Sequence, residues 1–133
     1  MTKKLEVYKC NVCGNIVEML HGGDGALVCC GEKMHLFEET ASDEGKEKHV
    51  PVIANTEKGL KVTIGSEPHP MTEKHYIEWI EVLTQDGVFR RELKPGMPPE
   101  AEFCSNGKAI RVREYCNVHG MWVNKFPPSG FSY

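Results

Sequence analysis

A cysteine and a histidine separated by two residues, Cys116-x2-His119, lie near the C-terminal end of the chain. A thiolate and an imidazole at this spacing can reach one metal ion from a single tight loop. Three more histidines, His49, His69 and His75, each lie beside a turn-forming residue or at the expected start of a strand. Four imidazoles and one thiolate exceed the four ligands of a structural zinc site. The set therefore favours a metal that accepts a higher coordination number, such as iron.

A lone histidine at a turn is usually an ordinary surface residue. We interpret these four as ligands because they occur together with a thiolate, and because prolines on both sides of His69 stiffen its loop. A stiff loop loses less entropy when a metal orders it.

A second cluster, of four cysteines, lies near the N-terminus. Cys10 and Cys13 bracket two residues, and Gly14 permits a backbone turn that aims both sulfurs at one point. The adjacent pair Cys29 and Cys30 completes a set of four thiolates, which suits tetrahedral zinc or a single iron. So short a segment needs such a metal to fold. Neighbouring side chains diverge, so we expect some distortion of the tetrahedron.

The composition is that of a soluble globular protein, with 133 residues of which 40% are hydrophobic and 26% charged. A formal net charge of −3 gives no basic field, which argues against nucleic-acid binding. Apolar runs are too short to span a membrane, and the first residues lack the apolar region of a signal peptide. We therefore expect a cytoplasmic protein, in which six cysteines are more typical of metal ligands than of disulfides. With four thiolates sufficient, His21 and His35 are expected to be bystanders.

The rest of the pattern predicts a mainly β protein. We expect a four-cysteine domain at residues 1–37, a charged linker at 38–48, a β-sandwich at 49–126 and a loose tail at 127–133. Seven short strands are expected in the sandwich, at residues 50–53, 60–64, 76–83, 88–93, 101–104, 109–113 and 122–126. Asp86-Gly87 predicts one hairpin, and Asn106-Gly107 predicts a second that would pair 101–104 with 109–113. Cys104 is expected to pack within its strand as a small apolar residue.

These residues together carry a family resemblance. The four-cysteine segment resembles the desulforedoxin-type iron knuckle, and the remainder resembles the two-iron superoxide reductases, the desulfoferrodoxins. The matching segments outside the knuckle are KEKHVPVI at 46–53, HPM at 69–71, EKHYIEWI at 73–80 and EYCNVHG at 114–120. The resemblance covers nearly the whole chain, and only the proline-rich end after residue 126 departs from it.

The resemblance implies two mononuclear irons per chain and an immunoglobulin-like sandwich, in a homodimer. It implies that His49, His69, His75 and His119 are equatorial ligands of the second iron, that Cys116 is axial, and that the sixth position is open. That iron would reduce superoxide to hydrogen peroxide and be re-reduced by a rubredoxin-like donor. Glu47 resembles the carboxylate that closes the sixth position of ferric iron. Lys48 resembles the residue that attracts superoxide and orders water beside it.

Two other interpretations are compatible with part of the sequence. A cupredoxin-like copper protein also has a β-sandwich and a Cys-x2-His loop, here followed by Met121, but it would use only two histidines. A non-enzymatic electron carrier would explain the four-cysteine cluster but not the second one.

Overall fold

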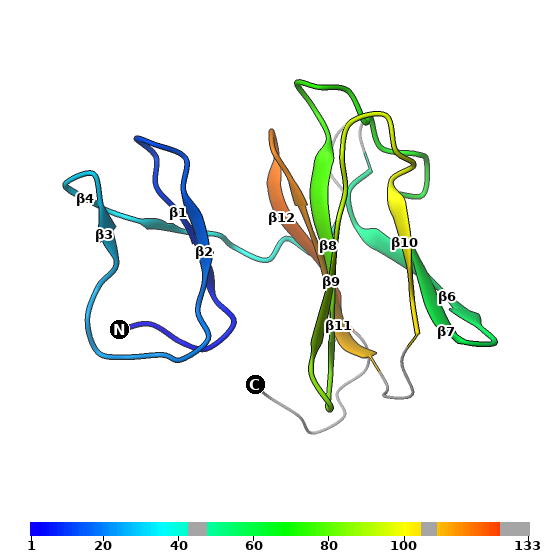
Figure 1. Cartoon of the computed structure of the whole chain (residues 1–133), viewed down its shortest axis with the longest axis horizontal. Coiled ribbons are helices and arrows are strands. Elements are labelled where there is room, and N and C mark those ends of the chain that lie inside the picture. The colour runs from blue at the N-terminus through cyan, green and yellow to red at the C-terminus, as the bar shows by residue number, and fades with distance from the viewer. Residues whose placement is uncertain (43–47, 105–108, 126–133) are drawn as a thin grey trace. The chain divides into compact units, whose positions relative to one another are not determined.

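The computed structural model describes residues 1–42, 48–104 and 109–125, and in these ranges the only regular secondary structure is β (Figure 1). The chain divides into two compact units, the first formed by Met1–Glu38 and the second beginning at Glu39. The described residues include no helix that is long and apolar enough to cross a membrane.

Residues 1–38, all of which are described, contain five strands of two or three residues each. They are β1 (Val7–Lys9), β2 (Ile16–Glu18), β3 (Val28–Cys29), β4 (Glu32–Lys33) and β5 (His35–Leu36). They form a sheet of order β2-β1-β5 and a separate pair β3-β4. Few apolar side chains of this unit are buried, chiefly Leu5, Val7 and Tyr8, while Leu20 is 80% exposed. So small a core supports the prediction that this unit needs a metal to hold it together.

The second unit contains seven strands among its described residues, as expected. They are β6 (Pro51–Thr56), β7 (Gly59–Ile64), β8 (Ile77–Thr84), β9 (Val88–Glu92), β10 (Glu100–Phe103), β11 (Ala109–Cys116) and β12 (Gly120–Lys125). One sheet has the order β10-β7-β6 and the other β12-β11-β8-β9 (Figure 1). The two sheets pack as the expected β-sandwich.

The core lies between these two sheets. In β7, burial alternates along the strand, so that Leu60, Val62 and Ile64 face inward. Ile80 of β8 and Val112 of β11, both fully buried, belong to the same cluster from the other sheet. This period of two is why the segment of β7 forms a half-buried strand.

The structure corrects two expectations about the strands. The hairpin at Asp86-Gly87 is confirmed, since β8 pairs with β9. The hairpin expected at Asn106-Gly107 is wrong: β10 pairs with β7, whereas β11 pairs with β8 and β12. The chain passes from one sheet to the other because Phe103 completes the core beside β7. Alternation then turns Cys104 outward, so this residue is exposed rather than packed.

Residues 39 and 40 of the predicted linker are already part of the second unit. The carbonyl of Thr40 accepts a hydrogen bond from Val123 N at 2.8 Å, which adds a short parallel bridge to β12. The Glu39 carboxylate binds Arg111 at 2.9 Å and the buried Arg113 at 3.2 Å. Of the regions expected to be linker and tail, 43–47 and 127–133 lie outside the described residues.

Candidate metal centres

The Cys-x2-His motif forms the turn of the β11–β12 hairpin. Cys116 is the last residue of β11 and pairs with Gly120, the first residue of β12. Gly120 has a φ of +87°, a left-handed value that glycine adopts without strain and that lets the chain reverse within three residues. The amide of His119 points back at Cys116 Sγ, 3.4 Å away. A backbone donor aimed at this sulfur stabilises its thiolate form.

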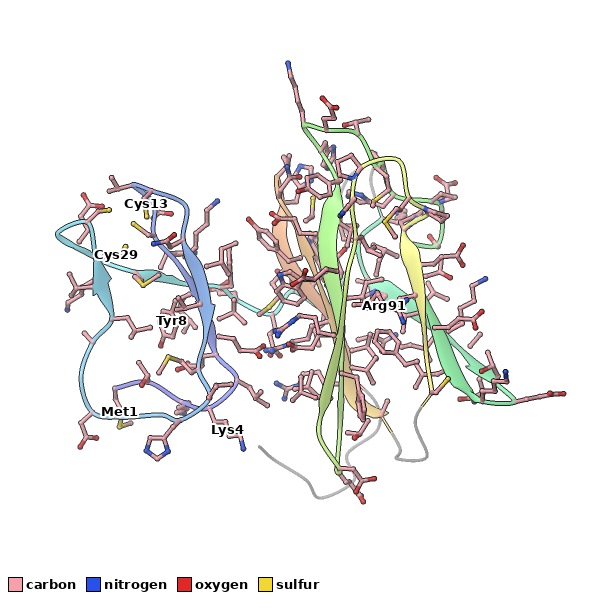
Figure 2. The ribbon with its side chains drawn as sticks, in the orientation of Figure 1. Met1, Lys4, Tyr8, Cys13, Cys29 and Arg91 are labelled. Atoms are coloured by element: carbon pink, nitrogen blue, oxygen red, sulfur yellow. The ribbon has the colours of Figure 1, made fainter. Side chains whose placement is uncertain are left out.

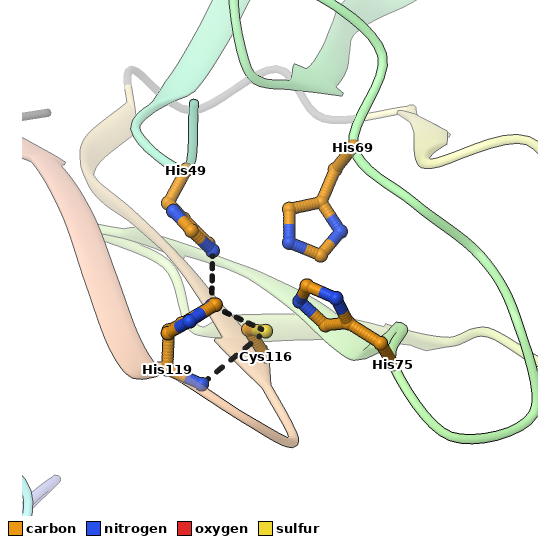
Figure 3. Close-up of side chains that lie close together, drawn as sticks. All are labelled: His49, His69, His75, Cys116 and His119. Carbon is orange, nitrogen blue, oxygen red and sulfur yellow. Dashed lines mark hydrogen bonds between the residues drawn. The ribbon is translucent and has the colours of Figure 1, made fainter. Parts of the chain in front are cut away.

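The other three histidines come from two separate connections. His49 directly precedes β6, and His69 and His75 lie in the segment between β7 and β8. Tertiary folding brings all five side chains together: one ligand atom from each lies within 4.8 Å of every other, although the residues extend from position 49 to position 119 of the sequence. Figure 3 shows the four imidazoles around a common centre, with the Cys116 sulfur seen between His75 and His119.

The four imidazoles form a closed ring. In the order His49, His69, His75, His119 and back to His49, neighbouring ring centroids are 4.6, 4.8, 5.1 and 4.9 Å apart. Neighbouring rings are inclined to each other by 62° to 86°. With the Cys116 sulfur, these four rings offer five ligand atoms close enough together to share one metal ion.

The spacing of the ligand atoms fits a metal. Nδ1 of His119 lies 3.2 Å from Nε2 of His49. Two nitrogens bonded at right angles to one metal, each about 2.1 Å from it, would be about 3.0 Å apart, and two opposite nitrogens about 4.2 Å. The observed limit of 4.8 Å for all five atoms accommodates both values. The donor set and its spacing therefore fit one iron ion, which these five side chains would hold.

Neighbouring groups orient two of the rings. Nδ1 of His69 lies 2.7 Å from the Pro70 carbonyl oxygen, so it carries the proton and Nε2 carries the lone pair. His49 stacks on the indole of Trp122, with ring centroids 4.5 Å apart and planes inclined by 12°. Both contacts restrict ring rotation, which preorganises the ligands.

Burial is unequal around the site. Cys116 is fully buried, and His49 and His69 are each 3% exposed. His75 is half-buried, and His119 is exposed. The site is therefore anchored in the sandwich on one side and open to solvent on the other.

The structure describes only one of the two residues that are predicted to act beside this site. Lys48 directly precedes His49 and is half-buried. Glu47 lies outside the described residues.

The four N-terminal cysteines also come together. Their sulfurs all lie within 4.8 Å of one another, and Figure 2 shows Cys13 and Cys29 at the same end of this unit. The Cys13–Cys29 and Cys29–Cys30 sulfur distances are 3.6 and 4.0 Å. A tetrahedron with metal–sulfur bonds of about 2.3 Å has sulfurs about 3.8 Å apart. The set therefore fits a single tetrahedral metal.

Adjacent cysteine side chains tend to diverge, but the backbone conformation at Cys30 brings the two sulfurs together. Cys30 has a φ of +54°, in the left-handed region that non-glycine residues rarely adopt. This conformation turns its sulfur toward the one that precedes it, instead of to the opposite side as in a strand. Gly14, with a φ of +86°, makes the expected turn after the first pair.

The thiols of this cluster differ in acidity. Backbone amides of Cys13 and Val12, each 3.4 Å from Cys10 Sγ, lower the pKa of the Cys10 thiol to about 6. Hydrogen bonding to Cys13 and then to Cys29 raises the pKa of Cys30 to about 12. One thiolate is thus available near neutral pH, while a metal must displace the proton of Cys30. We therefore expect metal binding to release protons.

Two contributors to the second centre were not expected from the sequence. Gly65 begins the segment that carries His69 and lies against the backbone of Lys48, next to His49: a Cβ on it would lie 2.5 Å from the Glu67 carbonyl oxygen and closer still to that of Lys48. Trp122 was expected only as a strand residue. The sequence held no signal for either role, because each depends on which loops meet in space.

The arrangement excludes the copper interpretation of the sequence. A blue copper site uses two histidines, one cysteine and a weak axial ligand, whereas here four imidazoles share one centre. Fold and sites define a class: a two-unit β protein with one four-thiolate and one four-imidazole, one-thiolate mononuclear centre.

Comparisons with known proteins agree with this class. A family model described as "Desulfoferrodoxin" matches residues 41–125, and one described as "Desulfoferrodoxin, N-terminal domain" matches residues 2–37. The chain belongs to the desulfoferrodoxin family. It is 57% identical to the desulfoferrodoxin of Nitratidesulfovibrio vulgaris over 92% of this chain and 97% of that protein. It is 55% identical to a desulfoferrodoxin homolog of Archaeoglobus fulgidus, over 92% and 98% of the two chains.

Solved structures show the same relationship. The superoxide reductase of Treponema pallidum has a TM-score of 0.77 and 28% identity, over 93% of this chain and all of that one. A one-iron superoxide reductase of Giardia intestinalis has a TM-score of 0.52 and 33% identity, over 61% of this chain and 98% of that one. The mainly β, two-part fold predicted from the sequence is confirmed.

Proposed function

We propose that the chain is a superoxide reductase with two mononuclear iron sites. The observation that carries the proposal is the cluster of four imidazoles and one buried thiolate, which is open to solvent at His119. Family membership and the superoxide reductases among its structural relatives support it. When bound there, ferrous iron supplies one electron, and with two protons superoxide becomes hydrogen peroxide.

Each protein group has a distinct role in this proposal. His49, His69, His75 and His119 hold the metal as neutral imidazoles, and Cys116 binds it as a thiolate. The thiolate pushes electron density toward the metal. It also reduces the net charge of a ferrous site from +2 to +1, which still attracts an anion. Cys10, Cys13, Cys29 and Cys30 hold the other iron.

The stoichiometry of the products tests this proposal directly. Pre-reduced, iron-loaded protein mixed with superoxide should form one hydrogen peroxide per superoxide consumed and no dioxygen. Dismutation would form half as much peroxide with an equal amount of dioxygen. A simple electron carrier would consume no superoxide beyond the uncatalysed rate. Either of these results would overturn the assignment.

We also propose that the two centres work as separable units, with residues 1–37 holding the first and 49–126 the second. The Cys13→Ser variant should lose the first iron only, because its thiolate belongs to the N-terminal cluster. Reduction of superoxide by the pre-reduced variant should persist at the wild-type rate. Iron analysis and stopped mixing with superoxide provide the measurement. Loss of the second iron as well would refute the separation.

Lys48 is proposed to attract superoxide to a protein of net charge −3. At roughly 6 Å and an effective dielectric of about 40, one unit charge contributes about 1.4 kcal/mol of attraction. Lys48→Ile should therefore slow the second-order reaction of the ferrous protein about tenfold. It should also flatten the decline of that rate with added salt, because salt screens the same attraction.

Glu47→Ala is a second variant for the same measurement. Glu47 is proposed to close the sixth position of the ferric site, so its removal should shift the ferric spectrum and leave superoxide capture nearly unchanged. Pulse-generated superoxide at several ionic strengths measures both variants. A Lys48→Ile protein with the wild-type rate and salt slope would show that this lysine is only part of a solvated loop.

The proposal also covers the compartment, the oligomeric state and the electron donor of the protein. We propose a cytoplasmic homodimer that receives electrons from a rubredoxin-like donor. The family resemblance and the use of cysteines as metal ligands support these assignments.

A further inference from the structure

A side chain inside the Cys-x2-His turn connects that turn to the segment carrying His75. The Oδ1 atom of Asn117 accepts a hydrogen bond from Tyr76 N at 2.9 Å, and its Nδ2 donates to the Lys74 carbonyl at 3.0 Å. The backbone amide of Asn117 also donates to the Tyr76 carbonyl, at 3.2 Å. Three bonds from one residue thus hold the two residues on either side of His75.

The turn that these bonds hold is itself closed. Thr72 N donates to the His75 carbonyl at 2.9 Å, and His75 N lies 3.2 Å from the Thr72 carbonyl and 3.1 Å from its hydroxyl. The backbone of His75 is therefore satisfied within its own turn. Asn117 supplies the link between this turn and the hairpin of Cys116 and His119, 41 residues further along the chain.

We propose that Asn117 is a positioning residue that holds His75 in register with Cys116 and His119. It lies next to one of these ligands and two residues before another, so it links three of the five metal-binding side chains. This inference rests on the proposed metal site. It does not depend on the reaction that occurs there.

The chemistry of the side chain suits this role. An amide offers one acceptor and one donor group in a rigid plane, and the neighbouring backbone presents one amide and one carbonyl. Aspartate would keep the acceptor but could not donate to the Lys74 carbonyl, and alanine would lose both bonds. If Asn117 only occupied space in the turn, neither its Oδ1 nor its Nδ2 atom would be needed.

Thr84 offers a matched control at the opposite end of β8. Its hydroxyl makes two comparable bonds to backbone in the β8–β9 turn, accepting from Asp86 N at 3.1 Å and donating to the Gly87 carbonyl at 3.2 Å. Thr84→Ala should therefore weaken the same sandwich without disturbing His75.

The test measures iron retention and backbone protection in the full-length, iron-loaded protein, with no superoxide present. Asn117→Ala should release the second iron to a ferrous chelator about tenfold faster than wild type, as outer partners of ligands do when removed. Thr84→Ala should release it at the wild-type rate. Hydrogen exchange at the Tyr76 amide should accelerate in Asn117→Ala and stay slow in Asn117→Asp.

Equal iron release from Asn117→Ala and Thr84→Ala would overturn the proposal. If Asn117→Ala does not fold, Asn117→Asp decides, since it keeps the bond to Tyr76: iron release faster than from Thr84→Ala supports the role, and equal release refutes it. Because these measurements involve no superoxide, their failure would leave the proposed reductase activity standing. Failure of the peroxide stoichiometry would in turn leave the role of Asn117 standing.

Discussion

Cys116→Ser is expected to remove the sulfur-to-iron charge-transfer band of the second centre and lower the rate of superoxide reduction by more than about 100-fold. Loss of an outer partner of a ligand already costs 10–100-fold, and loss of the ligand should cost more. Cys116 is fully buried, with the His119 amide aimed at its sulfur. A serine hydroxyl there would stay protonated, so the site would lose both its anionic charge and its electron donation.

Cys104→Ser is the matched control. Cys104 is exposed, and among the described residues it belongs to neither cluster of metal-binding side chains. This variant should keep both iron spectra and the wild-type rate. Visible spectra of the oxidised proteins, with iron analysis and the superoxide assay, provide the measurement. An unchanged second-centre band in Cys116→Ser would show that the thiolate is not a ligand.

Gly65→Ala is expected to disrupt the second centre although position 65 binds no metal. Gly65 has a φ of +84°, and a Cβ there would collide with two carbonyl oxygens, those of Lys48 and Glu67. These atoms are backbone, so relief requires the turn at Gly65 to distort and the segment bearing His69 to move away from Lys48, the neighbour of His49. Because the ligands must meet within a few ångströms, we expect the second iron to be lost and the first to be retained.

Gly96→Ala is the matched control, because it introduces the backbone strain of a left-handed residue without the collision. Gly96 has nearly the same φ, +87°, but a Cβ on it would meet nothing within 4 Å. It should cost about 1–2 kcal/mol, the penalty of a left-handed conformation alone, and keep both irons. Gly65→Ala should cost more. Thermal unfolding and iron analysis of both variants check this, and equal behaviour of the two would contradict the close approach.

Much of the fold could be read from local pattern. The strand expected at residues 60–64 and the Asp86-Gly87 turn depend on neighbours in sequence, and both are confirmed. The pairing of β10 could not be read in this way, since Asn106-Gly107 resembles a hairpin turn locally. Its outcome depends on which sheet Phe103 completes, and that is decided by core packing.

The sequence by itself determined the chemistry of this protein. The spacings Cys10-x2-Cys13 and Cys116-x2-His119 place two ligands on one turn each, because a turn of two or three residues leaves the chain little choice of direction.

Tertiary structure alone decided how the ligands meet. The approach of the His69 segment to Lys48 at Gly65 and the bonds of Asn117 to residues more than 40 positions away both depend on distant segments being packed together. Such contacts have no local signature, because their energy arises only when the sandwich has formed.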